Sequence, residues 1–247
     1  MNTLLLRMVA AGMAALPGAC WAASDGQAQV TLHYYERPPL HYTDAHARPA
    51  GFIVEKTSSI FNQAGISYAW KVTPANRILA LIKTAPGYHC TPGWYKNAER
   101  MQYARFSAPI YIDKPLVGLS RADFSAGEGI TARDLFRRPA LRLLLKQNFS
   151  QGAYMDKLIG QMPDANIQRV SAEVPVMVKM IRLGRADLIV TTQEETEAFV
   201  ASAGYRMDEF RVLKFPDVPA EEKRYILCGN NVPMELMRQL DEAISKP

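Results

Sequence analysis

The sequence has little excess of either charge and no long hydrophobic run beyond its first residues. Its 247 residues include 29 lysines and arginines against 24 aspartates and glutamates, a net charge of +5. The basic residues are interleaved with acidic ones, which argues against dedicated nucleic-acid binding. After the first 22 residues no stretch approaches the roughly 18 consecutive apolar residues that a transmembrane helix requires. With 48% hydrophobic and 21% charged residues, we expect a soluble protein of one large domain or two smaller lobes.

Sequence motifs of the common enzyme classes are also missing. The chain has no HExxH zinc motif, no GxSxG nucleophile turn, no GxGxxG nucleotide loop and no P-loop lysine. The four histidines, His33, His41, His46 and His89, lack the close pairwise spacing of metal ligands. We therefore expect surface or core histidines, no metal, no cofactor and no catalytic residue.

The first 22 residues have the pattern of a cleavable secretory leader. Arg7 precedes an apolar stretch at 8–16, and small residues, Cys20 and Ala22, occupy the third-last and last positions before the expected cut. A lipid anchor on Cys20 is the alternative, which Pro17 disfavours because an aliphatic residue is expected at that place. We expect an exported protein that begins at residue 23.

Cysteine is scarce, with three residues in all, and only Cys90 and Cys228 remain after removal of the leader. An even number in an oxidising compartment favours one disulfide. Both cysteines lie near the ends of predicted strands, and free thiols outside the cytoplasm would be open to oxidation. Two buried thiols are the alternative.

Strands and helices are predicted to alternate along the chain, and the rhythm restarts at about residue 110. Alternation at this spacing favours sheets with parallel strands and helices on both faces. Two similar lobes are the natural interpretation. The predicted strands are 30–35, 67–72, 88–90, 116–119, 141–145, 166–170, 186–191, 210–215 and 224–228, and the predicted helices are 52–64, 74–83, 132–136 (capped by Thr131), 151–161 (capped by Ser150), 173–183, 194–203 and a last one from Pro233.

The stretch from Cys90 to Tyr111 is the most informative. It contains two aromatic residues, the pair Glu99-Arg100 and the element FSAPIY at 106–111. It resembles the extracytoplasmic solute-binding proteins of the polar amino-acid ABC transporter type (family 3), in which an arginine at the cleft precedes a Phe-Ser-x-Pro-Tyr hinge strand. Further matches in the same order are the helix RILALI from Arg77, the turn SQG at 150–152 with Asp156, and MIRLGRAD at 180–187.

The resemblance implies a two-lobe periplasmic-binding-protein-like fold of type II. Its lobes would be 23–111 with 213–247, and 112–212, joined by crossings at about 108–113 and 212–218. This topology also brings Cys228 onto the sheet that contains Cys90. The family implies a periplasmic monomer that traps a small-molecule solute between its lobes and presents it to an inner-membrane ABC permease.

The binding residues are expected at the carboxyl ends of the strands, in the segments 35–40, 90–100, 147–152 and 191–193. Arg100 matches the family's carboxylate-binding arginine, whose guanidinium offers a planar fork to an anion. The candidate ligands, by role, are Arg100 for a carboxylate, Ser150 and Gly152 at a helix N-terminus for an anion, and Tyr35, Trp94 and Tyr95 as walls. For Arg100, an ion pair with Glu99 is the alternative.

One departure from the family pattern concerns the group that meets a ligand ammonium. Amino-acid binders of the family commonly carry an Asp just after the second-lobe strand, where this sequence has Thr192 or Gln193. Glu194 or Glu195 is a possible substitute, and so is Glu36 from the first lobe. An α-amino acid is therefore not the only solute to consider.

Three functions fit the sequence. The first is capture of a small, carboxylate-bearing solute for an ABC importer. The second is a ligand-sensing partner of a membrane receptor. The third is a dehydratase-like enzyme on the same fold, for which Glu173 and Glu194 are loose candidates as general acid or base.

Overall fold

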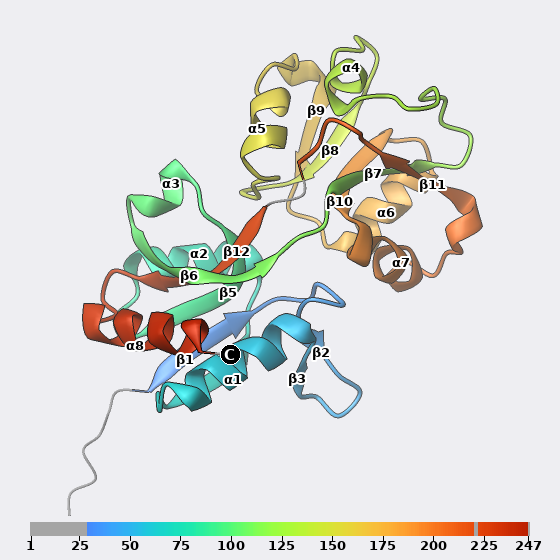
Figure 1. Cartoon of the computed structure of the whole chain (residues 1–247). Helices are drawn as coiled ribbons and strands as arrows, with labels where there is room; N and C mark the ends of the chain where they lie inside the picture. The colour runs from blue at the N-terminus through green and yellow to red at the C-terminus, as the bar shows by residue number, and fades with distance from the viewer. Residues whose placement is uncertain (1–28, 220–221, 247) are drawn as a thin grey trace, which may run out of the picture.

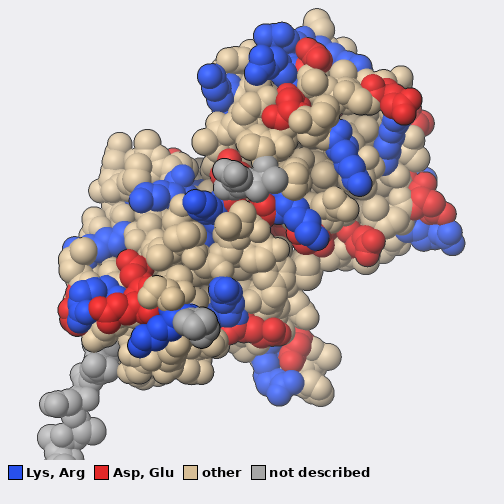
Figure 2. All heavy atoms as spheres, viewed as in Figure 1, with Lys and Arg blue, Asp and Glu red and all other residues tan. Residues whose placement is uncertain are grey.

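The computed structural model describes residues 29–219 and 222–246, which form two α/β lobes (Figure 1). The leader expected at 1–22 lies outside these residues. On the face shown in Figure 2, basic and acidic side chains are interleaved over both lobes. No helix within the described ranges is long and apolar enough to cross a bilayer.

The first lobe is built on a five-stranded sheet in the order β4-β1-β5-β12-β6. β1 runs parallel to β4 and β5, whereas β12 runs antiparallel to β5 and β6. The strand β12 follows the whole second lobe in the sequence. The sheet of the first lobe therefore combines strands from both ends of the chain. Its elements are β1 (Val30–Tyr34), β2 (Tyr42–Thr43), β3 (Pro49–Ala50), α1 (Phe52–Gln63), β4 (Tyr68–Val72), α2 (Ala75–Thr84), β5 (His89–Tyr95), α3 (Ala98–Met101), β6 (Ala104–Ile112), β12 (Lys223–Gly229) and α8 (Met234–Ser245).

The second lobe is built on a sheet in the order β11-β7-β10-β8-β9. β8 is parallel to β9 and β10, and β7 is antiparallel to β10 and β11. The sheet therefore joins parallel βα units to an antiparallel edge at the side where the chain enters and leaves. Its elements are β7 (Leu116–Arg121), α4 (Ala132–Phe136), β8 (Leu143–Lys146), α5 (Ala153–Ile159), η1 (Asp164–Asn166), β9 (Ile167–Val170), α6 (Val174–Arg182), β10 (Leu188–Thr192), α7 (Gln193–Ser202), η2 (Met207–Glu209) and β11 (Phe210–Lys214).

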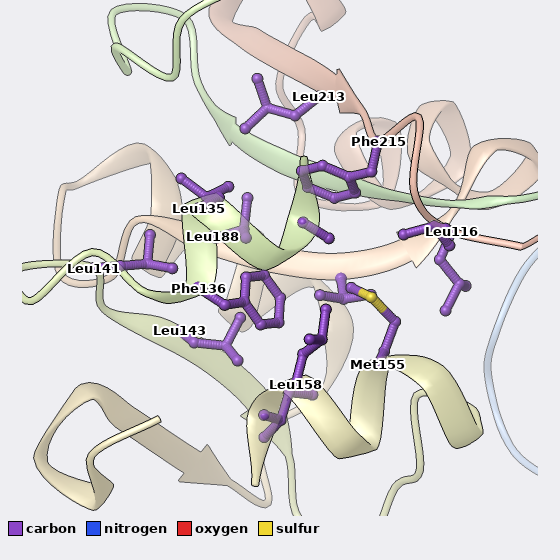
Figure 3. Packing of buried hydrophobic residues seen from close by; sticks show 14 of the residues in the cluster. Leu116, Leu135, Phe136, Leu141, Leu143, Met155, Leu158, Leu188, Leu213 and Phe215 are labelled. Atoms are coloured by element: carbon purple, nitrogen blue, oxygen red, sulfur yellow. The ribbon is translucent and has the colours of Figure 1, made fainter. Parts of the chain in front are cut away.

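Both faces of the second sheet are buried, which explains its unbroken aliphatic strands. Leu143 and Leu145 pack with α4 and α5 in the cluster shown in Figure 3, whereas Leu144 packs with Met177 and Phe199 on the opposite face. A strand with two covered faces needs apolar residues at every position. The two α/β lobes predicted from the sequence are confirmed.

Some local predictions differ from the structure. The strand predicted at 88–90 continues to Tyr95, because β12 pairs with β5 through a register shift that accommodates Pro92 and Gly93. The helix predicted at 151–161 is shorter. It begins after Gly152, which has a φ of 84° and occupies the N-cap position in place of Ser150. The Ser150 hydroxyl donates to Asp156 and accepts from the Gly152 amide at 3.2 Å.

The chain changes sheets after Ile112, where β6 ends, and again between the end of β11 at Lys214 and the start of β12 at Lys223. β6 stays in the first sheet because Ile112 still pairs with Lys223 of β12. β11 stays in the second sheet as far as Lys214, opposite Val117. Both changes of sheet therefore begin later than the crossings expected at 108–113 and 212–218.

A buried ion pair joins the two crossings. The Arg224 guanidinium donates to Asp113 Oδ1 at 2.7 Å, to the Gly93 carbonyl at 2.7 Å and to the Tyr95 hydroxyl at 3.2 Å. The Tyr95 hydroxyl itself donates to Asp113, and the Asp113 amide donates to the Glu222 carbonyl at 2.9 Å. Since Arg224 and Asp113 are 1% and 3% exposed, neither can lose its partner without leaving a buried charge.

The predicted disulfide is confirmed. Cys90 and Cys228 face each other on β5 and β12, with their Cα atoms 4.1 Å apart and 138 residues of sequence separation. The bond joins β12, which follows the second lobe in the sequence, to β5, which precedes it.

Loss of this bond should lower stability, because the unfolded chain regains the entropy of a long loop. We expect the double variant Cys90→Ala/Cys228→Ala to lose roughly 2 to 5 kcal/mol of unfolding free energy. Guanidinium denaturation with and without reductant measures the loss. Reductant should destabilise the wild type and leave the double variant unchanged, and equal stability of the two proteins would contradict the prediction.

Two histidines are buried in the first lobe without charge. His33 contacts Thr73 Oγ1 at 2.9 Å and His89 Nδ1 at 3.0 Å, and His41 Nδ1 lies 2.6 Å from the Tyr35 carbonyl oxygen. Burial, together with the nearby imidazole of His89 and charge of Lys71, lowers the pKa of His33 to about 4. Burial, together with the nearby charges of Arg37 and Arg224, lowers the pKa of His41 to about 3.

These histidines should make the protein acid-sensitive. Below the ordinary histidine pKa of about 6.5 the unfolded chain binds protons that the folded chain does not, so the free energy of unfolding falls as pH decreases. The slope should approach about 1.4 kcal/mol per pH unit for each histidine between pH 6.5 and 4.

Urea denaturation between pH 7.5 and 4.5 measures this slope. It should become shallower in His41→Asn and remain unchanged in His46→Gln, since His46 is exposed. A wild-type slope that persists in His33→Asn/His41→Asn would assign the acid sensitivity to other groups.

Candidate functional site

Residues of both lobes enclose a cleft with two connected parts. The inner cavity has a volume of about 40 Å³ and is lined by Tyr35 and Arg37 from the first lobe and by Lys146, Phe149 and Ser150 from the second. The outer groove has a volume of about 480 Å³. Its lining includes Glu36, Pro38 and Thr73 from the first lobe and Glu173, Val174 and Ser202 from the second. Tyr35 and Val174 border both parts, so they form one cleft.

The position of the cleft follows from the direction of the strands. Tyr35 to Arg37 follow β1, and Lys146 is the last residue of β8, with Phe149 and Ser150 between it and α5. In open sheets with parallel strands, the loops at the carboxyl ends of the strands border the crevice. The segments 35–40 and 147–152 singled out in the sequence therefore contribute to the lining.

A buried ion pair crosses the cleft between Arg37 and Glu195. Arg37 Nη2 donates to Glu195 Oε2 at 3.0 Å, Nε donates to the other oxygen, and the Arg37 and Glu195 side chains are 15% and 0% exposed. Glu195 lies in the first turn of α7, where Thr192 Oγ1 donates to Oε2 at 2.8 Å. Burial disfavours the charged carboxylate, but the charge and hydrogen bonds of Arg37 hold the pKa of Glu195 below its ordinary value.

Lys146 brings a second cation into the inner cavity. Its Nζ lies 2.7 Å from Glu173 Oε2 and 5.8 and 5.6 Å from the ring centres of Tyr35 and Phe149. Trp94 also packs against Tyr35 and Phe149, at centroid distances of 5.8 and 5.5 Å. Since Phe149 belongs to the second lobe, these rings join the lobes at the base of the cleft.

Arg100 is buried and lies between the lobes. Its side chain extends from α3 across the ring of Trp94 at 4.7 Å, and the residue is 3% exposed. Nη1 donates to the Tyr95 carbonyl at 2.8 Å, and Nη2 donates to the Asn148 carbonyl of the second lobe at 3.0 Å. Burial lowers the pKa of Arg100. The guanidinium thus bonds to one carbonyl from each lobe rather than to Glu99.

Of the other expected residues, some line the cleft and others pack outside it. Tyr35 lines both parts of the cleft, and Glu36 lines the outer groove, where its carboxylate accepts from the Thr43 amide at 3.1 Å. Trp94 packs beneath Arg100. Tyr95 instead contacts Asp113 and Arg224 at the crossings, so it supports the hinge region rather than the lining of either part of the cleft.

Residues expected to offer donors at a helix N-terminus already have partners. Ser150 lines the inner cavity, but its hydroxyl donates to Asp156 and the Gln151 amide donates to the same carboxylate. Burial raises the pKa of Glu222, from the second crossing, and the nearby amides of Ala153 and Tyr154 act against this rise. A Cβ at Gly152 would lie 2.1 Å from Glu222 Oε1, so glycine is needed for this approach.

Sequence reasoning did not single out Arg37, Lys146 or Phe149 as site residues. Arg37 and Phe149 lie within the segments expected at the cleft, and Lys146 is a charged residue directly after the leucines at 143–145. These signals place the residues near the cleft but do not identify their partners. Thr192 lies next to the cleft as N-cap of α7, and its hydroxyl orients Glu195.

The arrangement is suited to holding a small molecule. The cationic groups of Arg37 and Lys146 converge with the rings of Tyr35 and Phe149 on a cleft whose walls belong to separate lobes. Within the described residues no group of three or more His, Cys, Asp and Glu side chains is arranged as a metal site, and Cys90 is held in the disulfide.

Comparison with solved structures shows a shared fold. The arginine-, lysine-, histidine-binding protein ArtJ from Geobacillus stearothermophilus is 21% identical, with a TM-score of 0.69 over 87% of this chain and 87% of that chain. An ancestral arginine-binding protein bound to arginine is 15% identical, with a TM-score of 0.68 over 88% and 91%. A histidine kinase sensor domain with similarity to periplasmic binding proteins is 16% identical, with a TM-score of 0.69 over 88% and 89%.

The sequence itself places the chain in a family. No curated protein matches it. Residues 31–213, however, match the bacterial extracellular solute-binding proteins, family 3. This match covers most of the chain, from the second residue of β1 to the last but one residue of β11. The protein belongs to the bacterial extracellular solute-binding proteins of family 3.

Proposed function

We propose that this protein captures a small, carboxylate-bearing solute between its lobes and presents it to an ABC permease in the inner membrane. The observation that carries the proposal is the convergence of Arg37 and Lys146 at one cleft between two lobes, with the buried Arg100 bonded to a carbonyl of each lobe. Family membership supports a solute-binding role without catalysis. The proposal includes export to the periplasm by the leader at 1–22 and action as a monomer.

The dimensions of the cleft favour a solute that enters when the lobes separate. The inner cavity, at about 40 Å³, holds no more than a few water molecules. The outer groove, at about 480 Å³, is within the size range of small-molecule sites. Separation of the lobes would widen both parts of the cleft, and closure would desolvate the solute's charged group.

Arg100 is the proposed carboxylate ligand. Its Nη2 reaches across to the Asn148 carbonyl, which belongs to the opposite lobe, so separation of the lobes frees this donor. A carboxylate that accepts from the guanidinium fork makes a stronger, charge-assisted bond than a carbonyl. Glu195 and Glu36 are the proposed partners if the solute also carries an ammonium group.

A sensing role is the second candidate. The similarity in fold to a histidine kinase sensor domain, over 88% of this chain, supports it. In this alternative the closed lobes would be recognised by a membrane receptor instead of a permease. Pull-down of detergent-solubilised inner-membrane proteins with the solute-loaded protein distinguishes the two partners.

Arg100 is expected to carry a large part of solute affinity. After mass spectrometry has identified the co-purified solute, calorimetry should show that Arg100→Ala loses about 2 to 5 kcal/mol of binding free energy, because a desolvated carboxylate is left unpaired. Arg100→Lys should recover little of it, since an ammonium lacks the planar fork.

The control is Arg105→Ala, which removes an arginine of the same lobe whose guanidinium bonds to the Val232 carbonyl away from the cleft. Thermal unfolding of each variant confirms that it is folded. Wild-type affinity in a folded Arg100→Ala protein would show that the carboxylate site lies elsewhere.

A further inference from the structure

The Arg37–Glu195 pair is unusual among the ion pairs of the described residues because it is buried and its partners belong to different lobes. The carboxylate is held by Thr192 within its own lobe, at 2.8 Å. The guanidinium also donates to the Tyr35 hydroxyl of its own lobe, at 3.2 Å. Each partner is therefore positioned before the two meet, which reduces the conformational entropy lost when they pair.

Further contacts between the lobes lie around this pair. Asn148 Nδ2 of the second lobe donates to Asn76 Oδ1 of the first at 3.2 Å. The rings of Tyr35 and Phe149 meet edge to face, with centroids 5.5 Å apart, and the Arg37 guanidinium lies 5.8 Å from the centre of Phe149. Side chains of the two lobes thus contact each other directly around the pair.

Pairing of Arg37 with Glu195 lowers the main electrostatic cost of closing the cleft. Two charges moved out of water lose hydration energy, and only a well-oriented pair with further hydrogen bonds offsets that loss. The fork geometry and the Thr192 and Tyr35 hydroxyls meet this condition. Removal of one charge leaves the other buried and unpaired in the closed state, which disfavours closure.

We propose that the Arg37–Glu195 ion pair is an intramolecular latch that closes the cleft without solute. The latch competes with solute, because both require the same space between the lobes. Solute affinity is then reduced by the fraction of molecules that are latched. The inference rests on the proposed function only for this competition, and the latch itself is tested without any solute.

Distances between spin labels on the two lobes test the latch. Val72 of the first lobe and Val176 of the second are 53% and 52% exposed, and both can be replaced by labelled cysteines while the native disulfide stays oxidised. The protein is unfolded, dialysed to remove co-purified molecules and refolded before measurement. The wild type should give one short, narrow distance distribution, and Arg37→Gln and Glu195→Gln should each give a longer, broader one.

Two further variants make the test specific. The charge swap Arg37→Glu/Glu195→Arg should restore part of the short distance, because the pair is remade across the cleft. Arg142→Gln is the matched control, since Arg142 makes a bidentate pair with Asp187 inside the second lobe, and it should leave the distance unchanged. If thermal unfolding shows that the Gln variants are unfolded, Glu195→Asp keeps the charge, shortens its reach and should still lengthen the distance.

Two outcomes overturn the latch. One is a distance distribution that is the same in the wild type, in folded Glu195→Gln and in Glu195→Asp. The other is a wild type that is already open without solute. Neither outcome affects solute capture, which is tested by the loss of affinity in Arg100→Ala. Conversely, an open Glu195→Gln protein together with full affinity in Arg100→Ala would support the latch and refute the proposed carboxylate site.

Discussion

A fully buried arginine at the junction of the two crossings is the constraint on which the arrangement of the lobes depends. Arg224 is the second residue of the final strand of the first lobe, and its charge is matched by Asp113, where the chain leaves that lobe. Because neither group contacts solvent, the two crossings stay together as long as the first lobe is folded. Rotation of the second lobe is then confined to the few residues beyond this pair. The disulfide between Cys90 and Cys228 joins β5 to β12, further along β12 from the crossings than Arg224.

The cleft combines two kinds of contact that respond differently to opening. Aromatic rings from both lobes, Tyr35, Trp94 and Phe149, gain from burial irrespective of solute charge. Charged groups gain only when a partner of opposite sign is present in the right geometry. Arg37 and Glu195 supply such partners to each other, and Arg100 uses backbone carbonyls. A solute therefore has to offer better partners than the chain does, which links specificity to the closing of the lobes.

Much of the frame could be predicted because it depends on local patterns. The nearly aliphatic run at 141–145 predicts a strand covered on two faces. Thr131 caps a helix by accepting from the Asp134 amide, three residues later in the chain. Cys90 and Cys228 could be paired because topology returns the chain to the first sheet. Boundaries were less accurate where distant strands decide them. β5 continues through Pro92 and Gly93, where β12 lies beside it, and helix α5 begins only after Gly152, which the side chain of Glu222, 70 positions later in the chain, approaches closely.

The sequence by itself determined the α/β alternation, the two lobes, the disulfide partners and two segments that border the cleft, 35–40 and 147–152, because hydrophobic periodicity and turn residues act over short distances. Only the tertiary structure decided which charges meet. Arg37 and Glu195 are 158 positions apart, and nothing near either one in the chain indicates the other. Likewise, whether Tyr95 faces the cleft or the crossings depends on Arg224, which a different strand supplies. Partner choice is a property of the folded arrangement, since electrostatic and hydrogen-bond energies depend on distances that the order of residues does not contain.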